Sequence, residues 1–184
     1  MKNTAKLLSL ALVLLMTVAC FAACSGDSKV NYAKNNTEYY IGASGPLTGG
    51  AAVYGIAVKN SAQMAVDEIN AKGGVNGVKL KFVMMDDAHK PENVSTNYTT
   101  MFEAGMQVSL GCVTSAPCLE FKTLSHNDNL FFLTPSASAD AVVEYDNAYQ
   151  MCFADANQGS EAARYVNANY AGQTIGMLYR SDDP

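Results

Sequence analysis

Short apolar runs alternate with longer segments of helical spacing along most of the chain. The apolar runs lie at 38–44, 79–85, 108–110 and 130–133. Segments in which apolar residues recur with helical periodicity lie between them, at 54–72, 91–104 and 117–127. Because a strand–helix–strand crossover is right-handed, successive strands of this kind run parallel. The pattern therefore predicts an α/β fold built on a doubly wound parallel sheet.

The predicted helix at 54–72 has the clearest division into two faces. Its apolar face is formed by Val58, Ala62, Ala65, Val66 and Ile69. Its solvent face is expected to carry Lys59, Gln63, Asp67 and Asn70. The pair Gly73 and Gly74 directly after it is typical of a helix end.

The pattern continues beyond Ala139, although less regularly. It predicts an extended run at 148–153, a helix at 160–170 and a further strand at 174–179. The sequence ends at Pro184, directly after that strand and before the helix that should follow it. We therefore expect the sequence to stop early in a second structural unit.

Loops of small hydroxyl residues follow two of the predicted strands, at Gly111–Ser115 and Thr134–Ser138. In a parallel sheet both loops lie at the carboxyl edge, where open α/β sheets bind ligands. Pro117 is typical of the first turn of a helix, so Ser115 is expected just before a helix start, which favours an anion. The hydroxyls of Ser115, Ser136 and Ser138 would complete a site for a small polar ligand.

Two further loops at this edge lack the motifs of nucleotide and metal sites. The glycine-rich loop at 45–55 has neither the Gly-Lys-Ser/Thr of a P-loop nor the Gly-x-Gly-x-x-Gly spacing of a dinucleotide site. Asp86 and Asp87 follow the second predicted strand, but adjacent strand residues point to opposite faces. We interpret the two aspartates as hydrogen-bond acceptors that fix their loop, and we expect neither a metal nor a cofactor.

Residues 1–24 have the features of the signal peptide of an exported lipoprotein. Two lysines precede an apolar segment at 7–19, and small residues then lead to Cys20 and Cys24. Cys24 is the favoured lipidation site because polar residues begin directly behind it, and Cys20 is the alternative. An uncleaved membrane helix is a second interpretation, although the apolar run is short for a span. The polar residues 25–37 would form a flexible tether.

The net charge of −5 gives no reason to expect nucleic acid as a partner. Three cysteines lie beyond the signal segment: Cys112, Cys118 and Cys152. A Cys112–Cys118 disulfide would have to bridge a strand end and a helix start, so buried thiols are the favoured interpretation. The histidines are His89 and His126 alone, and neither is expected to pair with a nucleophile, so a serine or cysteine hydrolase is disfavoured.

Six motifs occur in a fixed order along the chain. They are Gly45–Gly49 with Val53–Gly55, Ala65–Gly77, Asp86–Asp87, Gly111–Ser115, Leu133–Ala139 and Asp155–Gly159. Together they resemble the solute-binding lipoproteins of ABC transporters of the leucine/isoleucine/valine-binding type, which have the type I periplasmic-binding fold. The resemblance implies two α/β lobes that close on a ligand. Residues 38–153 would form the N-terminal lobe, and 154–184 the incomplete start of the second.

The resemblance also implies roles for individual residues. Ser115 matches the serine that binds the ligand carboxylate, and Ser136 matches the position whose backbone carbonyl holds the ligand ammonium. Ser138 matches a hydroxyl residue that contacts the same ammonium. The acidic residue of the second lobe that meets the ammonium would lie beyond Pro184.

Pocket-lining positions are implied at Tyr54, Val113 and Thr114, where aromatic and small side chains suit an aliphatic ligand. We therefore predict a substrate-binding component of an ABC importer for branched-chain or other small aliphatic amino acids, and not an enzyme. It would be anchored by lipid on the outer face of the bacterial cytoplasmic membrane, or alternatively be periplasmic, and would deliver its ligand to permease subunits. A ligand-sensing lobe of a signalling receptor and a non-functional fragment are the alternatives.

Overall fold

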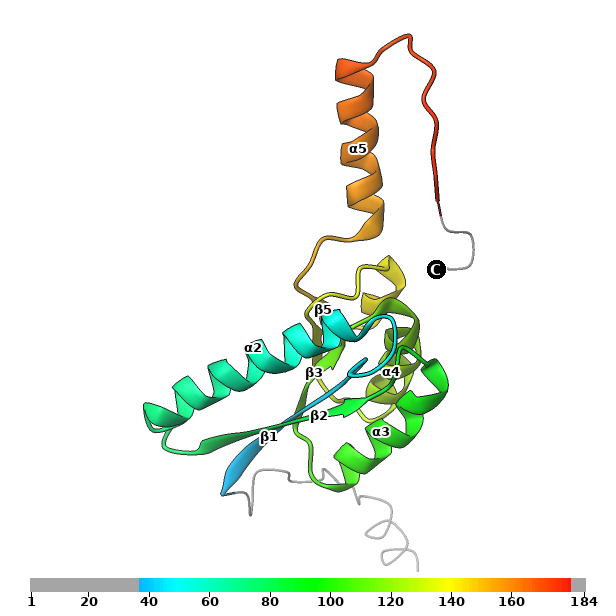
Figure 1. The fold of residues 1–184 in the computed structure, drawn as a ribbon. Helices are drawn as coiled ribbons and strands as arrows, with labels where there is room; N and C mark the ends of the chain where they lie inside the picture. Colours follow the sequence, from blue (N-terminus) through cyan, green and yellow to red (C-terminus); the bar gives the residue numbers. More distant parts are fainter. Residues whose placement is uncertain (1–36, 180–184) are drawn as a thin grey trace, which may run out of the picture. The chain divides into compact units, whose positions relative to one another are not determined.

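A five-stranded parallel sheet forms the centre of the computed structural model, which describes residues 37–179 (Figure 1). Its strands are β1 (Glu38–Gly45), β2 (Lys79–Asp86), β3 (Val108–Cys112), β4 (Phe132–Thr134) and β5 (Ala148–Gln150). Their spatial order is β2-β1-β3-β4-β5. The helices are α2 (Ala52–Ala71), α3 (Pro91–Glu103), α4 (Ser115–Asn127) and α5 (Asp155–Asn169), with a 3-10 turn, η1, at Asp140–Val143. The predicted signal peptide, its two cysteines and most of the tether lie outside the described residues.

Helices cover the two faces of the sheet unequally. Helix α2 packs against β2 on one face, whereas α3 packs against β1 and β2 and α4 against β3 and β4 on the other (Figure 1). The side chains form two separate apolar clusters, a large one under α3 and α4 and a small one under α2. The predicted doubly wound α/β fold is therefore confirmed.

Phe121 of α4 lies at the centre of the larger cluster and is fully buried. Its ring packs edge-on against Tyr98 of α3 at 5.1 Å and against Phe132 of β4 at 5.4 Å between centroids. Edge-to-face packing of this kind is favourable beyond the burial of apolar area. These contacts hold the two helices against the strands that carry the hydroxyl-rich loops.

Three helices begin earlier than the sequence pattern predicts, and for α2 the difference is two residues. Helix α4 begins at Ser115, so this residue lies inside the first turn and Thr114 is the N-cap. Pro117 fits the third helical position as well as the first, because none of the first N–H groups needs an intrahelical acceptor. Helix α5 begins at Asp155, five residues before the predicted start at Ser160, with Gly159 inside it. A single helical glycine costs only about 1 kcal/mol, so it does not end the helix.

The strand predicted at 174–179 is absent from the described part of the chain, where these residues have no regular structure. Ile175, Met177 and Leu178 are exposed instead of paired. A strand forms only when a partner supplies its hydrogen bonds, and no described strand pairs with this segment. Apolar alternation alone could not predict this outcome. For the same reason the extended run at 148–153 is paired only as far as Gln150.

Asn70 of α2 does not face solvent as predicted. Its Nδ2 donates to the carbonyl oxygen of Leu80, and its Oδ1 accepts from the Leu80 N–H, each at 2.8 Å. The side chain thereby satisfies both backbone groups of a residue in β2, a strand at the edge of the sheet. Ala65, which was expected on the apolar face, is exposed, whereas Val66 is buried as predicted.

Candidate functional site

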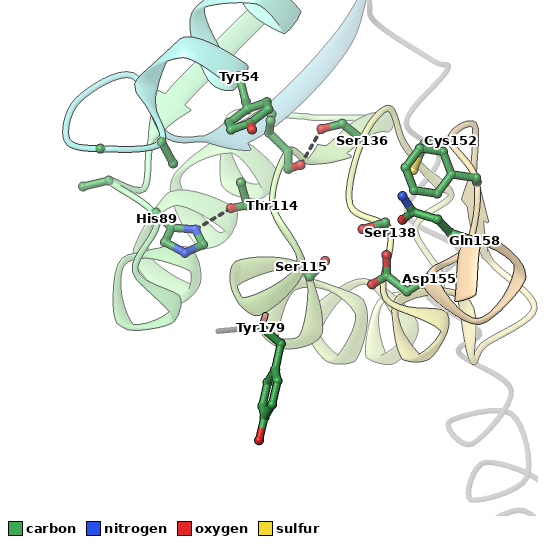
Figure 2. Close-up of a pocket in the computed structure, with 15 residues that line it drawn as sticks. Tyr54, His89, Thr114, Ser115, Ser136, Ser138, Cys152, Asp155, Gln158 and Tyr179 are labelled. Carbon is green, nitrogen blue, oxygen red and sulfur yellow. Dashed lines mark hydrogen bonds between the residues drawn. The ribbon is translucent and has the colours of Figure 1, made fainter. Parts of the chain in front are cut away.

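An open cavity of about 1330 Å³ lies among the loops at the carboxyl edge of the sheet. All six residues singled out from the sequence line it: Tyr54, Val113, Thr114, Ser115, Ser136 and Ser138 (Figure 2). They come from the loops after β1, β3 and β4 and the helix starts that follow the first two of these loops. The parallel connection of the strands brings these loops together, as expected for an open α/β sheet.

The start of α4, where Ser115 lines the cavity, has hydrogen-bond donors without recorded acceptors. The first turn of a helix has N–H groups without intrahelical acceptors. In α4, the N–H of Cys118 reaches the Thr114 carbonyl oxygen at 3.1 Å, and Pro117 has no N–H. Among the described residues, the structure records no acceptor for the N–H groups of Ser115 and Ala116. Together with the positive end of the helix dipole, they can bind an anion.

The Ser115 hydroxyl is also available to a ligand. Its oxygen accepts a hydrogen bond from the Ala139 N–H at 3.3 Å, so its own proton remains free to donate. That bond joins the start of α4 to the loop after β4, which contains the other two serines. The hydroxyl of Ser136 donates to the Val113 carbonyl oxygen at 2.5 Å and joins the same two loops. The two hydroxyl-rich loops therefore form one wall of the cavity.

A backbone hydrogen bond joins the loop after β4 to the start of α5 at the cavity. The carbonyl oxygen of Ser138 accepts a hydrogen bond from the Asp155 N–H at 2.9 Å. This contact places the Asp155 carboxylate beside Ser138 and opposite Ser115 (Figure 2). Of the residues that line the cavity, Asp155 is the one with a carboxylate. The cavity therefore has donors for an anion at α4 and a negative group near Ser138.

Asp86 fixes two loops at once, which confirms its interpretation as a hydrogen-bond acceptor. Its carboxylate accepts from the N–H groups of Leu47 and Ala88, at 2.7 and 2.8 Å, and from the hydroxyl and N–H of Thr48, at 2.6 and 3.3 Å. Partial burial tends to raise the pKa of Asp86, but these hydrogen bonds together outweigh it and lower the pKa below its ordinary value. The carboxylate thus joins the loop after β1 to the loop after β2.

Asp87 is completely buried and has the same role in a different environment. It accepts from the Ser44 hydroxyl at 3.0 Å and from the His89 N–H at 2.9 Å. Burial raises the pKa of Asp87 because it disfavours the charged carboxylate, and the two hydrogen bonds only partly offset this effect. No cluster of three or more metal-ligating side chains occurs among the described residues.

Several cavity residues were not selected from the sequence: His89, Cys152, Phe153, Asp155, Gln158 and Tyr179. Asp155 and Gln158 belong to a motif that the resemblance had already identified, so that motif was the available signal. Tyr179 is the last residue of the segment 174–179, which was wrongly predicted as a strand. His89 lies two residues beyond a predicted strand end, where local sequence does not indicate the direction of the side chain.

The three cysteines of the described residues are free thiols. Cys112 and Cys118 are buried, which confirms the favoured interpretation, whereas Cys152 is partly exposed and lines the cavity. Burial raises the pKa of the Cys112 thiol well above its ordinary value. A buried neutral thiol is a poor nucleophile. Burial also raises the pKa of the thiol of Cys152, the cysteine that lines the cavity.

The family model for periplasmic binding proteins matches residues 38–184. The chain belongs to this family. Its members are binding proteins, which agrees with the expectation that the chain is not an enzyme. Among curated relatives, the chain is similar to the Leu/Ile/Val-binding protein BraC3 of Rhizobium johnstonii, with 34% identity over 145 residues. It is also 28% identical over 139 residues to the Leu/Ile/Val-binding protein of Escherichia coli K12.

A solved structure agrees with this assignment. The chain resembles the branched-chain amino acid transporter substrate binding protein LivJ of Streptococcus pneumoniae, crystallised with isoleucine. The TM-score is 0.67 and the identity is 27%, over 72% of this chain and 38% of LivJ. BraC3 is matched over 78% of this chain and 40% of its own length. The chain thus spans well under half of the relatives that it matches. No helix among the described residues is both long and apolar enough to cross a membrane.

Proposed function

We propose that the full-length protein containing this chain binds a branched-chain or other small aliphatic amino acid for an ABC importer. The observation that carries the proposal is that one cavity is lined both by the three serines selected from the loop pattern and by the three positions implied by the family resemblance. The names of the relatives support the substrate class, because they are described as binding leucine, isoleucine and valine. LivJ, which shares the fold over most of this chain, was crystallised with isoleucine.

In the proposed binding mode, the ligand carboxylate docks at the start of α4. It accepts hydrogen bonds from the Ser115 hydroxyl and from the N–H groups of Ser115 and Ala116. The ligand ammonium donates to the carbonyl oxygen of Ser136 and to the Ser138 hydroxyl, and the Asp155 carboxylate balances its charge. The hydroxyl of Ser136 already donates to the Val113 carbonyl oxygen, so the carbonyl oxygen is the group that Ser136 offers to the ligand. Such charge-assisted bonds are stronger than neutral ones.

The aliphatic side chain of the ligand would contact Tyr54, Val113 and Phe153. Val113 is buried, whereas Tyr54 and Phe153 are 61% and 59% exposed in the described chain. Exposed aromatic rings on the wall of a binding cavity are typical contact surfaces for an apolar group. In our proposal a second lobe, to which residues 154–184 belong, closes over these rings and excludes water. Exclusion of water strengthens the polar contacts to the ligand.

Export and anchoring complete the proposal. Cys24, or alternatively Cys20, would carry the lipid, and residues 25–37 would tether the lobes to the membrane. Permease subunits would receive the ligand from the closed form. Mass spectrometry of the protein extracted from membranes would identify the lipidated cysteine.

The experiment that tests the function is a calorimetric titration of the full-length protein with a panel of amino acids. We expect binding of isoleucine, leucine or valine. We expect Ser115→Ala to weaken it by about 1–3 kcal/mol, because a buried ligand carboxylate then loses a donor. Ser61→Ala, on the exposed surface of α2, is the matched control and should bind as the parent does. Unchanged affinity in Ser115→Ala would refute the assignment of the carboxylate position, and absence of binding to every amino acid would refute the function.

A further inference from the structure

Thr114 is the N-cap of α4 but does not cap it with its side chain. A threonine at this position normally accepts a hydrogen bond from the N–H of the second or third helical residue. In α4 the third residue is Pro117, which has no N–H, so Ala116 is the one residue that Thr114 could cap. The Thr114 hydroxyl instead lies 2.9 Å from Nδ1 of His89, as the dashed line in Figure 2 shows. While the Thr114 hydroxyl makes this contact, the structure records no hydrogen bond between it and the Ala116 N–H.

An unusual loop holds His89 in the position that makes this contact. Ala88 and His89 both have left-handed backbone conformations, with φ of 53° and 61°. Side chains other than glycine rarely adopt this conformation, and surrounding contacts must enforce it. Asp86 accepts from the Ala88 N–H and Asp87 from the His89 N–H, at 2.8 and 2.9 Å.

Two asparagines of helix α3 hold the same loop by hydrogen bonds. Nδ2 of Asn93 donates to the Asp87 carbonyl oxygen and Nδ2 of Asn97 donates to the Asp86 carbonyl oxygen, each at 3.0 Å. The His89 ring is thus attached to a rigid support and not to a mobile loop. It also lines the cavity itself.

From these contacts we propose that His89 is a positioning residue that keeps the anion site at the start of α4 open. By engaging the Thr114 hydroxyl, it prevents that hydroxyl from satisfying the Ala116 N–H. The donor therefore remains available to an incoming carboxylate. This inference rests on the proposed function, because it assumes that a carboxylate binds there.

The inference predicts an unusual pattern among variants of the full-length protein. His89→Leu frees Thr114, which then caps α4 through Ala116 and competes with the ligand. We expect exchange of the Ala116 amide hydrogen in the ligand-free protein to slow about fivefold, and the affinity for isoleucine to fall by a similar factor. About fivefold corresponds to the roughly 1 kcal/mol of an average N-cap. His89→Asn keeps a polar group near the position of Nδ1 and tolerates the left-handed conformation, so both quantities should stay near parental values.

The same His89 substitution made in a Thr114→Val variant distinguishes a positioning role of His89 from general structural support. With Thr114→Val the hydroxyl is missing, so adding His89→Leu should change neither Ala116 exchange nor affinity by more than about twofold. His126→Leu, which removes the other histidine at the far end of α4, is the matched control and should leave Ala116 exchange unchanged. Exchange would be followed by nuclear magnetic resonance without ligand, and affinity by calorimetry with isoleucine.

The outcomes are distinct. If Ala116 exchange does not respond to His89→Leu, or responds equally in the parental and Thr114→Val backgrounds, the positioning role is wrong even when the protein binds isoleucine. If the parent protein binds no amino acid, the proposed function is wrong. The response of the Ala116 amide then still decides whether His89 controls the helix start.

Discussion

Replacing Gly55 by alanine should destabilise the protein although alanine is the better helix former. Gly55 lies in the first turns of α2 and is buried against the loop after β1. A Cβ atom added there would lie 1.8 Å from the Pro46 carbonyl oxygen and 2.6 Å from its carbonyl carbon. The obstacle is backbone, so no side-chain rotation can relieve it. The loop or the helix must retreat by roughly 1.5 Å to reach ordinary contact.

The expected cost follows from two opposing effects. In a free helix, glycine to alanine stabilises by about 1 kcal/mol. Overfilling a packed contact costs about 1–3 kcal/mol and sometimes more, and here it displaces backbone. With the upper end of this cost, about 3 kcal/mol, less the helical gain of about 1 kcal/mol, we expect Gly55→Ala to lower the free energy of unfolding by about 2 kcal/mol. Because the displaced loop leads to Gly50 and Ala51, which line the cavity, the affinity for the ligand should fall as well.

Gly159→Ala is the matched control. Gly159 is also helical, in α5, and no atom lies within 4 Å of the position of its added Cβ. This variant should be unchanged or more stable by about 0.5–1 kcal/mol. Urea unfolding of the two ligand-free variants, followed by circular dichroism, measures the difference. If Gly55→Ala is as stable as Gly159→Ala, the close approach of Pro46 to α2 is wrong.

Two further predictions concern the core and the pH dependence of stability. Phe121→Ala should lower the free energy of unfolding in urea by about 3–5 kcal/mol, because the ring is fully buried between Tyr98 and Phe132. Phe121→Leu should lower it by clearly less. Equal losses in the two variants would contradict the role of the aromatic contacts. The lowered pKa of Asp86 means that its carboxylate stabilises the fold at pH values above the ordinary carboxyl pKa, and that this contribution disappears as the pH falls through the lower pKa of the folded state. Urea unfolding measured at pH values from 7 to 3 should therefore show that the parent is more stable than Asp86→Asn at neutral pH and that the difference shrinks in acid. A difference that stays constant with pH would contradict this role of Asp86.

Much of the fold could be predicted because it depends on local patterns. The periodicity of apolar residues distinguishes strands from helices, and parallel connections place every loop after a strand at one edge. That edge was sufficient to select Ser115, Ser136 and Ser138 from the sequence. The errors in the predicted helices concern their boundaries. At the start of α4, for example, Pro117 is compatible with more than one position in the first turn.

Failures of prediction occur where a residue depends on a partner distant in sequence. The segment 174–179 has the alternation of a strand but pairs with no described strand. Asn70 has the spacing of a solvent-facing residue but binds the backbone of Leu80. In both cases the deciding hydrogen bonds come from another element, and periodicity contains no information about them.

The amino-acid sequence by itself determined the class of fold, the edge at which a ligand would bind and the hydroxyl groups available there. Tertiary structure alone decided which of those groups are free. Thr114 has the side chain of a helix cap, yet His89 engages it from a different loop, and the Ala116 N–H is left without a described acceptor. The physical reason is that a hydrogen-bonding group can have several suitable partners along the chain, and only the packing of distant loops selects one.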